Sequence, residues 1–186
     1  VLATGLNNLG LLLKSLKRYA DAESLYLESL AIRRRVAGNE SPDVAASLNN
    51  LGALYAAQSR FAEAEPCYQE ALAIRRKVYG ERHVDVATVE QNLATLLLYE
   101  SKLDEADALQ RRALATRLEA LGSSHPEVAR SRQALALILL ARGRATEARA
   151  IMEECLAAQS EAEDLDAVLV AWSRSLLGQC LLAEGH

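Results

Sequence analysis

Five leucines stand 42 residues apart along this chain of 186 residues, and a glycine or an alanine follows each of them. They are Leu9, Leu51, Leu93, Leu135 and Leu177. A fixed period of this length indicates a repeat array, because each repeat buries its apolar face only by stacking on a neighbour. The spacing predicts one array over residues 1–186, with repeats at about 1–42, 43–84, 85–126 and 127–168 and a partial fifth repeat at 169–186.

Each repeat contains two amphipathic stretches separated by a short polar break. In the first stretch apolar residues recur at steps of three and four, as at Leu6, Leu9 and Leu13, which is typical of a helix with one buried face. The second stretch has small residues at two positions seven apart, which predict where the two helices cross. These are Ala22, Ala64, Ala106 and Ala148, and then Ser29, Ala71, Ala113 and Cys155. No sustained strand pattern is present, so we expect an all-α fold with about nine helices in antiparallel pairs.

The ends of these helices carry their own signals. Pro42 and Pro126 each follow a polar residue and precede an acidic one, which is typical of a helix N-terminus. His83 and His125 recur just before a helix start, and we interpret them as caps or loop-packing residues, because no further metal ligands lie nearby. Glycines follow the second helix where a left-handed C-cap is expected, at Gly38, Gly80 and Gly122. The fourth repeat has Asp164 there, so the junction at 159–166 should be the least regular.

The net charge of the chain limits the classes of partner that we expect it to bind. A net charge of −4 and a pI near 5.5 argue against a nucleic-acid partner, which usually selects a basic surface. The local basic clusters have a simpler interpretation as cations in the last turn of a helix, where they meet the negative end of its dipole. These clusters are Arg33–Arg35, Arg75–Lys77 and Arg111-Arg112.

Other classes of site are not supported by the sequence. The three cysteines are odd in number and form no CxxC pair, so they are interpreted as small buried residues of a protein in a reducing, cytoplasmic compartment. No membrane span or signal peptide is expected. No motif for a metal, cofactor or catalytic nucleophile is found, so we expect no enzyme and no cofactor. The chain does not begin with Met, and we expect a fragment of a longer protein.

The residues around the leucines resemble a known repeat. Leu then Gly or Ala, with an Ala thirteen residues after the Leu and a large residue such as Tyr26 or Tyr68 beyond it, resembles the tetratricopeptide pattern. The 42-residue period, the opening LNNLG and the closing ALAIRRKVYG are similar to the tetratricopeptide domain of kinesin light chains and their relatives. The resemblance covers essentially the whole chain.

This resemblance implies a right-handed superhelical solenoid whose first helices line a concave groove for extended peptides. In the relatives, paired Asn side chains on these helices bond to the peptide main chain, and nearby basic residues favour acidic segments with an aromatic anchor. An amide suits this role because it offers a donor and an acceptor to any peptide bond. The matching amides are Asn7, Asn8, Asn49, Asn50, Gln91 and Asn92, and the further groove positions are Lys14, Ala53, Thr95 and Tyr99.

Alternatives remain for several of these residues. The Asn pairs also fit a structural role, in which they satisfy backbone groups at helix starts or bridge adjacent repeats. The amides are replaced by Gln133-Ala134 and then Ser175-Leu176, which places the expected binding in the first three repeats. Trp172 either covers the terminal repeat or anchors a partner.

These observations predict a non-catalytic scaffold or adaptor that binds a protein or peptide segment and neither nucleic acid nor membrane. One alternative is a self-assembly or spacer module, motivated by apolar faces at the terminal repeats, such as Leu176, Leu177 and Leu181. Another is a regulatory repeat region of a larger multidomain protein. An enzyme would need a catalytic domain outside this sequence.

Overall fold

The computed structural model describes residues 1–161 and 166–185, where nine α-helices and no strand are found. The helices are α1 (Leu2–Ser15), α2 (Tyr19–Ala37), α3 (Pro42–Ala57), α4 (Phe61–Tyr79), α5 (Val84–Tyr99), α6 (Leu103–Leu121), α7 (Pro126–Ala141), α8 (Ala145–Ser160) and α9 (Ala167–Glu184). They form two compact units, an N-terminal unit at Val1–Glu81 and a C-terminal unit at Arg82–His186.

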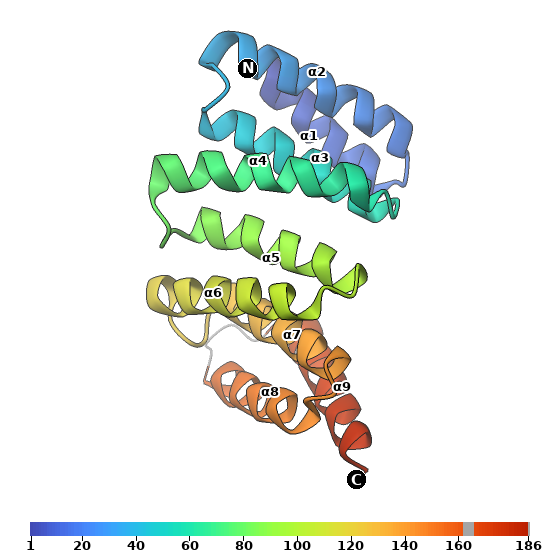
Figure 1. Ribbon diagram of the computed structural model, residues 1–186, viewed down its shortest axis with the longest axis vertical. Helices are drawn as coiled ribbons and strands as arrows, with labels where there is room; N and C mark the ends of the chain where they lie inside the picture. Colours follow the sequence, from blue (N-terminus) through green and yellow to red (C-terminus); the bar gives the residue numbers. More distant parts are fainter. Residues whose placement is uncertain (162–165, 186) are drawn as a thin grey trace. The chain divides into compact units, whose positions relative to one another are not determined.

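Successive helices pack on one another within each unit (Figure 1). In the N-terminal unit α1 packs on α2, α2 on α3 and α3 on α4. In the C-terminal unit the same succession runs from α5 to α9. The odd-numbered helices, here called first helices, also contact each other, because α1 touches α3 and α7 touches both α5 and α9. Short connections make the two helices of each pair antiparallel.

A glycine on the first helix faces a tyrosine on the second in each pair of the N-terminal unit. A Cβ atom placed on Gly10 would lie 2.7 Å from Cε1 of Tyr26, and one on Gly52 would lie 2.8 Å from Cε1 of Tyr68. Both tyrosines are buried, so the rings have little room to move. The C-terminal unit has alanine at the glycine position and smaller or more flexible side chains opposite, as the pairs Ala94 with Gln110 and Ala136 with Met152.

The small residues expected at the helix crossings are fully buried. All eight positions, Ala22, Ala64, Ala106, Ala148, Ser29, Ala71, Ala113 and Cys155, have no exposed surface. Their small size lets the second helix lie close to its neighbours on both sides. Their complete burial is the outcome expected if the second helix makes close contacts at these positions.

The turn inside each pair requires a residue with positive φ. Lys17, Ser59 and Ser101 have φ near 60°, and Gly143 has φ of 72° at the same position of its repeat. A side chain with a Cβ is strained in this conformation, whereas glycine is not. The polar break seen in the sequence is thus a turn of fixed geometry.

The helix ends agree with the sequence in most details. His83 Nδ1 accepts a hydrogen bond from Asp85 N, and His125 Nδ1 accepts one from Glu127 N, both at 3.1 Å. The capping interpretation is therefore confirmed. The three expected C-cap glycines, Gly38, Gly80 and Gly122, do have positive φ, but their ψ of 163–170° is extended and not the left-handed helical value expected. This region of backbone space is open essentially to glycine alone.

Two further sequence interpretations need correction, and another falls partly outside the described residues. Arg111 and Arg112 are not in a last turn, because α6 continues to Leu121 and its last turn has no basic residue. Leu176 is not an unpartnered apolar residue, since α9 packs on α7 and α8 and buries it. Asp164 lies outside the described residues, although α8 is 16 residues long where α2, α4 and α6 have 19.

Polar contacts also join successive pairs within each unit. Glu23 on α2 accepts a hydrogen bond from Tyr55 Oη at 3.0 Å and forms an ion pair with Arg60 at 2.7 Å. Burial and the neighbouring Glu23 carboxylate raise the pKa of Tyr55 to about 12. In the C-terminal unit Asp107 on α6 similarly pairs with Arg142 and Arg144 at the following turn.

The facing of glycine and tyrosine gives a direct test of the packing. Gly52→Ala should destabilise the protein by up to about 2 kcal/mol, because overpacking costs about 1–3 kcal/mol and alanine regains roughly 1 kcal/mol of helix propensity. Combining it with Tyr68→Met, which reproduces the Ala136 and Met152 pair, should cost less than the two single changes added together. Urea unfolding measures all three. Gly178→Ala is the control, because no atom lies within 4 Å of its added Cβ, and it should not destabilise.

Candidate functional site

The expected amides of the N-terminal unit come together on the first helices. Asn50 Nδ2 on α3 donates to Asn7 Oδ1 on α1 at 3.0 Å, and this pair bridges two adjacent repeats. The bond leaves Asn7 with its amide hydrogens and Asn50 with its carbonyl oxygen. Asn8 is exposed, and Asn49 is half-buried. Bridging and binding are therefore compatible roles, because one amide group serves both.

Other expected residues extend this surface of the N-terminal unit. Lys14 is half-buried, and burial lowers the pKa of its ammonium group. Ala53 is half-buried on α3, and Leu11 on α1 is largely exposed. We call the surface formed by these positions and the amides the first-helix face. It combines amides with apolar side chains and one cation from Lys14.

The first-helix face of the C-terminal unit is built around Gln91 on α5. Its Oε1 accepts hydrogen bonds from Arg117 Nη1 and from Ser131 Oγ, the latter at 3.0 Å. Asn92, the neighbouring amide, is half-buried. Thr95 is exposed and donates its hydroxyl to the Gln91 main-chain oxygen at 2.9 Å.

Two aromatic side chains on first helices of the C-terminal unit are exposed to solvent. Tyr99 near the end of α5 is 68% exposed, and Trp172 on α9 is 51% exposed. Trp172 therefore does not act as a buried cover for α9. Leu182 on the same helix is also largely exposed. Such rings provide large contact areas for a partner at low cost in side-chain entropy.

Buried arginines beneath this face were not predicted from the sequence. Arg33 Nη1 on α2 donates to the Asp43 main-chain oxygen and to Ser47 Oγ, each at 2.8 Å, and Arg33 is buried. Arg117 occupies the equivalent position of the third repeat. The last-turn interpretation is right for Arg34, Arg35, Arg76 and Lys77 but wrong for Arg33 and Arg75. The signal was available in the sequence, because an arginine recurs at 33, 75 and 117 and a serine at 47 and 131.

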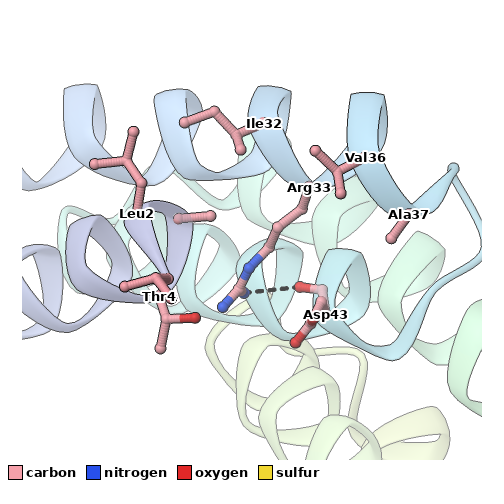
Figure 2. Close-up of a pocket in the computed structure, with 9 residues that line it drawn as sticks. Leu2, Thr4, Ile32, Arg33, Val36, Ala37 and Asp43 are labelled. Carbon is pink, nitrogen blue, oxygen red and sulfur yellow. Dashed lines mark hydrogen bonds between the residues drawn. The ribbon is translucent and has the colours of Figure 1, made fainter.

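A hollow of about 310 Å³ lies in the N-terminal unit between α1, α2 and the start of α3 (Figure 2). Ile32, Val36 and Ala37 form an apolar wall, and Arg33 reaches inward to bond with Asp43. Thr4 adds a hydroxyl group to its rim. None of the expected amides lines this hollow, so it is separate from the first-helix face.

Neither a membrane-spanning helix nor a metal-binding cluster is found in the described residues. No described helix combines the length and the apolar composition that a membrane crossing requires. Within residues 1–161 and 166–185, no group of three or more His, Cys, Asp or Glu side chains is arranged to hold a metal ion. Cys67, Cys155 and Cys180 are free thiols, and burial raises the pKa of the Cys67 thiol to about 11.

Comparison with known proteins identifies the repeats. The family model described as "Tetratricopeptide repeat" matches residues 1–77, 43–119 and 85–159. No match was found among curated proteins. The matched ranges overlap and together cover most of the chain.

Solved structures of similar proteins cover almost all of this chain. One is a single-residue variant of the nearly identical TPR-like repeats of a kinesin light chain-type protein from Podosopora anserina. Its TM-score is 0.86 at 23% identity, and the match covers 98% of this chain and 86% of that chain. BtubC (BKLC) from P. vanneervenii has a TM-score of 0.85 and 26% identity over 97% of this chain and 72% of that chain. The expected all-α solenoid of the kinesin light chain-like type is thus confirmed as a fold.

Adjacent arginines provide a test of the buried contact. Arg33→Met should destabilise the protein by about 2–3 kcal/mol, because it removes two buried hydrogen bonds from a charged donor, to Ser47 Oγ and to the Asp43 main-chain oxygen. Arg34→Met is the matched control. It removes only a partly exposed ion pair with Glu70 and should cost at most about 1 kcal/mol. Equal losses of stability in chemical unfolding would contradict the assigned difference.

Proposed function

This chain belongs to the tetratricopeptide repeat family, and on that premise we propose that it is a non-catalytic adaptor that binds extended peptide segments on the first-helix faces of its units. Tetratricopeptide arrays generally mediate contacts between proteins and generally carry no catalysis. The observation that supports the proposal is the recurrence of side-chain amides on first helices, at Asn7, Asn50 and Gln91. Each keeps a donor or acceptor beyond its contact with the neighbouring repeat.

The partner segment is proposed to be recognised chiefly through its main chain. Amides pair with peptide bonds of any sequence, whereas side-chain pockets supply specificity. The basic, acid-free helix α1, with Lys14 in its last turn, supports the narrower proposal of an acidic segment. Tyr99 and Trp172 offer surfaces against which an aromatic side chain would pack. The cytoplasmic location and the place of the array in a longer protein remain predictions.

Substitution of two amides tests the proposal. Peptides are first selected on the wild-type protein from a random-sequence display library. The double change Asn49→Ala and Asn50→Ala should then weaken their binding roughly tenfold or more, as expected for the loss of one or two hydrogen bonds. Fluorescence anisotropy measures affinity, and circular dichroism checks helicity. Asn39→Ala in the loop after α2 is the control and should bind normally. Unchanged affinity of the double variant would reject the site.

A second candidate function, self-association, is favoured by one observation. Leu9 and Leu12 on α1 are 47% and 55% exposed, whereas their equivalents Leu51 and Leu54 on α3 are almost completely buried. An apolar helix face of this kind is a surface for another helix. Sedimentation velocity over a range of concentrations tests it. Concentration-dependent dimers that Leu12→Gln abolishes would support self-association, and a monomer at the highest concentration would count against it.

A further inference from the structure

Gln91, Arg117 and Ser131 form a closed triangle of hydrogen bonds between three helices of the C-terminal unit. Arg117 on α6 is 3% exposed, and its Nη1 donates to Gln91 Oε1 and, at 2.5 Å, to Ser131 Oγ. Ser131 Oγ in turn donates to Gln91 Oε1 at 3.0 Å. Arg117 Nη2 is held by Thr88 Oγ1 at 3.2 Å. The guanidinium group is therefore fixed from several sides.

This triangle determines which edge of the Gln91 amide is left for a partner. An amide oxygen accepts about two hydrogen bonds, and here both come from the protein. An arginine always donates and never accepts, so the amide cannot rotate by half a turn without placing its own NH2 against a donor. In the part of the chain that the structure describes, neither hydrogen of Gln91 Nε2 has an acceptor. Gln91 is half-buried on the same helix as exposed Thr95.

Two other amides of the chain show that this arrangement is specific. Gln133 is the equivalent residue on α7, and its Nε2 donates to the Leu169 main-chain oxygen and to Ser173 Oγ. The residue in the position of Arg117 is there Gln159, so the arginine that bonds to Gln91 Oε1 has no counterpart in this repeat. Asn7 on α1 is one methylene shorter than Gln91 and bonds to Asn50, while Arg33 bonds to Ser47 and Asp43.

We propose that Arg117 is a positioning residue that holds Gln91 as a hydrogen-bond donor on the first-helix face, so that the bound segment presents an acceptor oxygen there. The inference rests on the proposed peptide binding and adds the polarity of one contact. The acceptor is a main-chain carbonyl or a side-chain carboxylate of the peptide, which share the required chemistry. At Gln91 the protein does not recognise a peptide N–H.

Two substitutions of Gln91 test separately whether its oxygen is held by the protein and whether its NH2 group binds the peptide. Gln91→Glu keeps an oxygen for Arg117 and Ser131 but replaces the NH2 group with a second oxygen. The charge-assisted bond to Arg117 should leave Tm equal to or above that of the wild type. Gln91→Leu removes the shared acceptor and should lower Tm by roughly 4 °C. A lower Tm for Gln91→Glu than for Gln91→Leu would overturn the triangle as described.

Binding of the library-selected peptides then tests whether the Gln91 NH2 group donates to the peptide. Gln91→Glu should bind them at least tenfold more weakly than wild type although its stability is retained. Peptides that bind wild type and Gln91→Glu equally would overturn the inference while leaving the proposed function in place. Failure to select any peptide on the wild type would overturn both. Gln69→Glu, on the exposed surface of α4, is the charge-matched control and should bind normally.

The role of Arg117 has its own spectroscopic readout. In the wild type the two proton signals of the Gln91 side-chain NH2 should be displaced from those of free amides, because the amide oxygen accepts hydrogen bonds from Arg117 and Ser131. Arg117→Met should move them toward the free-amide positions and leave those of Gln133 in place. Signals of Gln91 that do not respond to Arg117→Met would contradict the positioning role.

Peptide variants identify the source of the acceptor. Each acidic residue of a selected peptide is replaced by its amide counterpart, and binding to wild type and Gln91→Glu is compared. If the affinity difference persists, the acceptor is a main-chain carbonyl. If it disappears, the acceptor is a side-chain carboxylate. Both outcomes support a donor at Gln91, and they assign its partner.

Discussion

The close approach of the two helices in each pair determines where the other contacts of the repeats can form. Gly10 against Tyr26 and Gly52 against Tyr68 leave no room for an additional carbon between them. The buried alanines of the second helices, such as Ala22 and Ala64, allow equally close contact along their length. Interiors of this density have little freedom to adjust. The side chains at the edges of each pair are therefore held at reproducible positions from one repeat to the next.

This packing brings buried polar groups of the second helices under the first-helix face. Arg33 reaches Ser47, and Arg117 reaches Ser131, in each case on the first helix of the following repeat. A buried charged group is stable only when its donors are satisfied, which fixes the side chains around it. In the C-terminal unit Arg117 also donates to the Gln91 amide oxygen and so holds that amide in one orientation. Preorganised donors and acceptors reduce the entropy lost on binding.

The sequence predicted those features that depend on local pattern. The period located the helix pairs, the small residues located the crossings, and His83 and His125 were recognised as caps. The burial of Arg33 was not predicted, because a cation near a helix C-terminus already has a sufficient local explanation. Its actual partners belong to the next repeat and become neighbours only after packing.

The candidate site was predicted less completely for a related reason. The resemblance identified the amides, but it could not assign the partners of Gln91 or the direction of its hydrogen bonds. Arg117 sets that direction at Gln91, whereas the equivalent residue of the next repeat is Gln159. Both residues can be read from the sequence, but only the structure shows that Arg117 bonds to Gln91. The exposure of Trp172 and the burial of Leu176 likewise follow from how α9 packs on α7 and α8.

The most direct measurement of the central claim is a map of NMR chemical-shift changes when a library-selected peptide is added to the isotope-labelled protein. We expect the largest changes on first-helix residues, at the side-chain amides of Asn7 and Asn50 for a peptide bound to the N-terminal unit or at that of Gln91 for one bound to the C-terminal unit. Changes confined to the exposed surfaces of α2, α4 and α6, or to the apolar surface of α1 around Leu12, would contradict that claim.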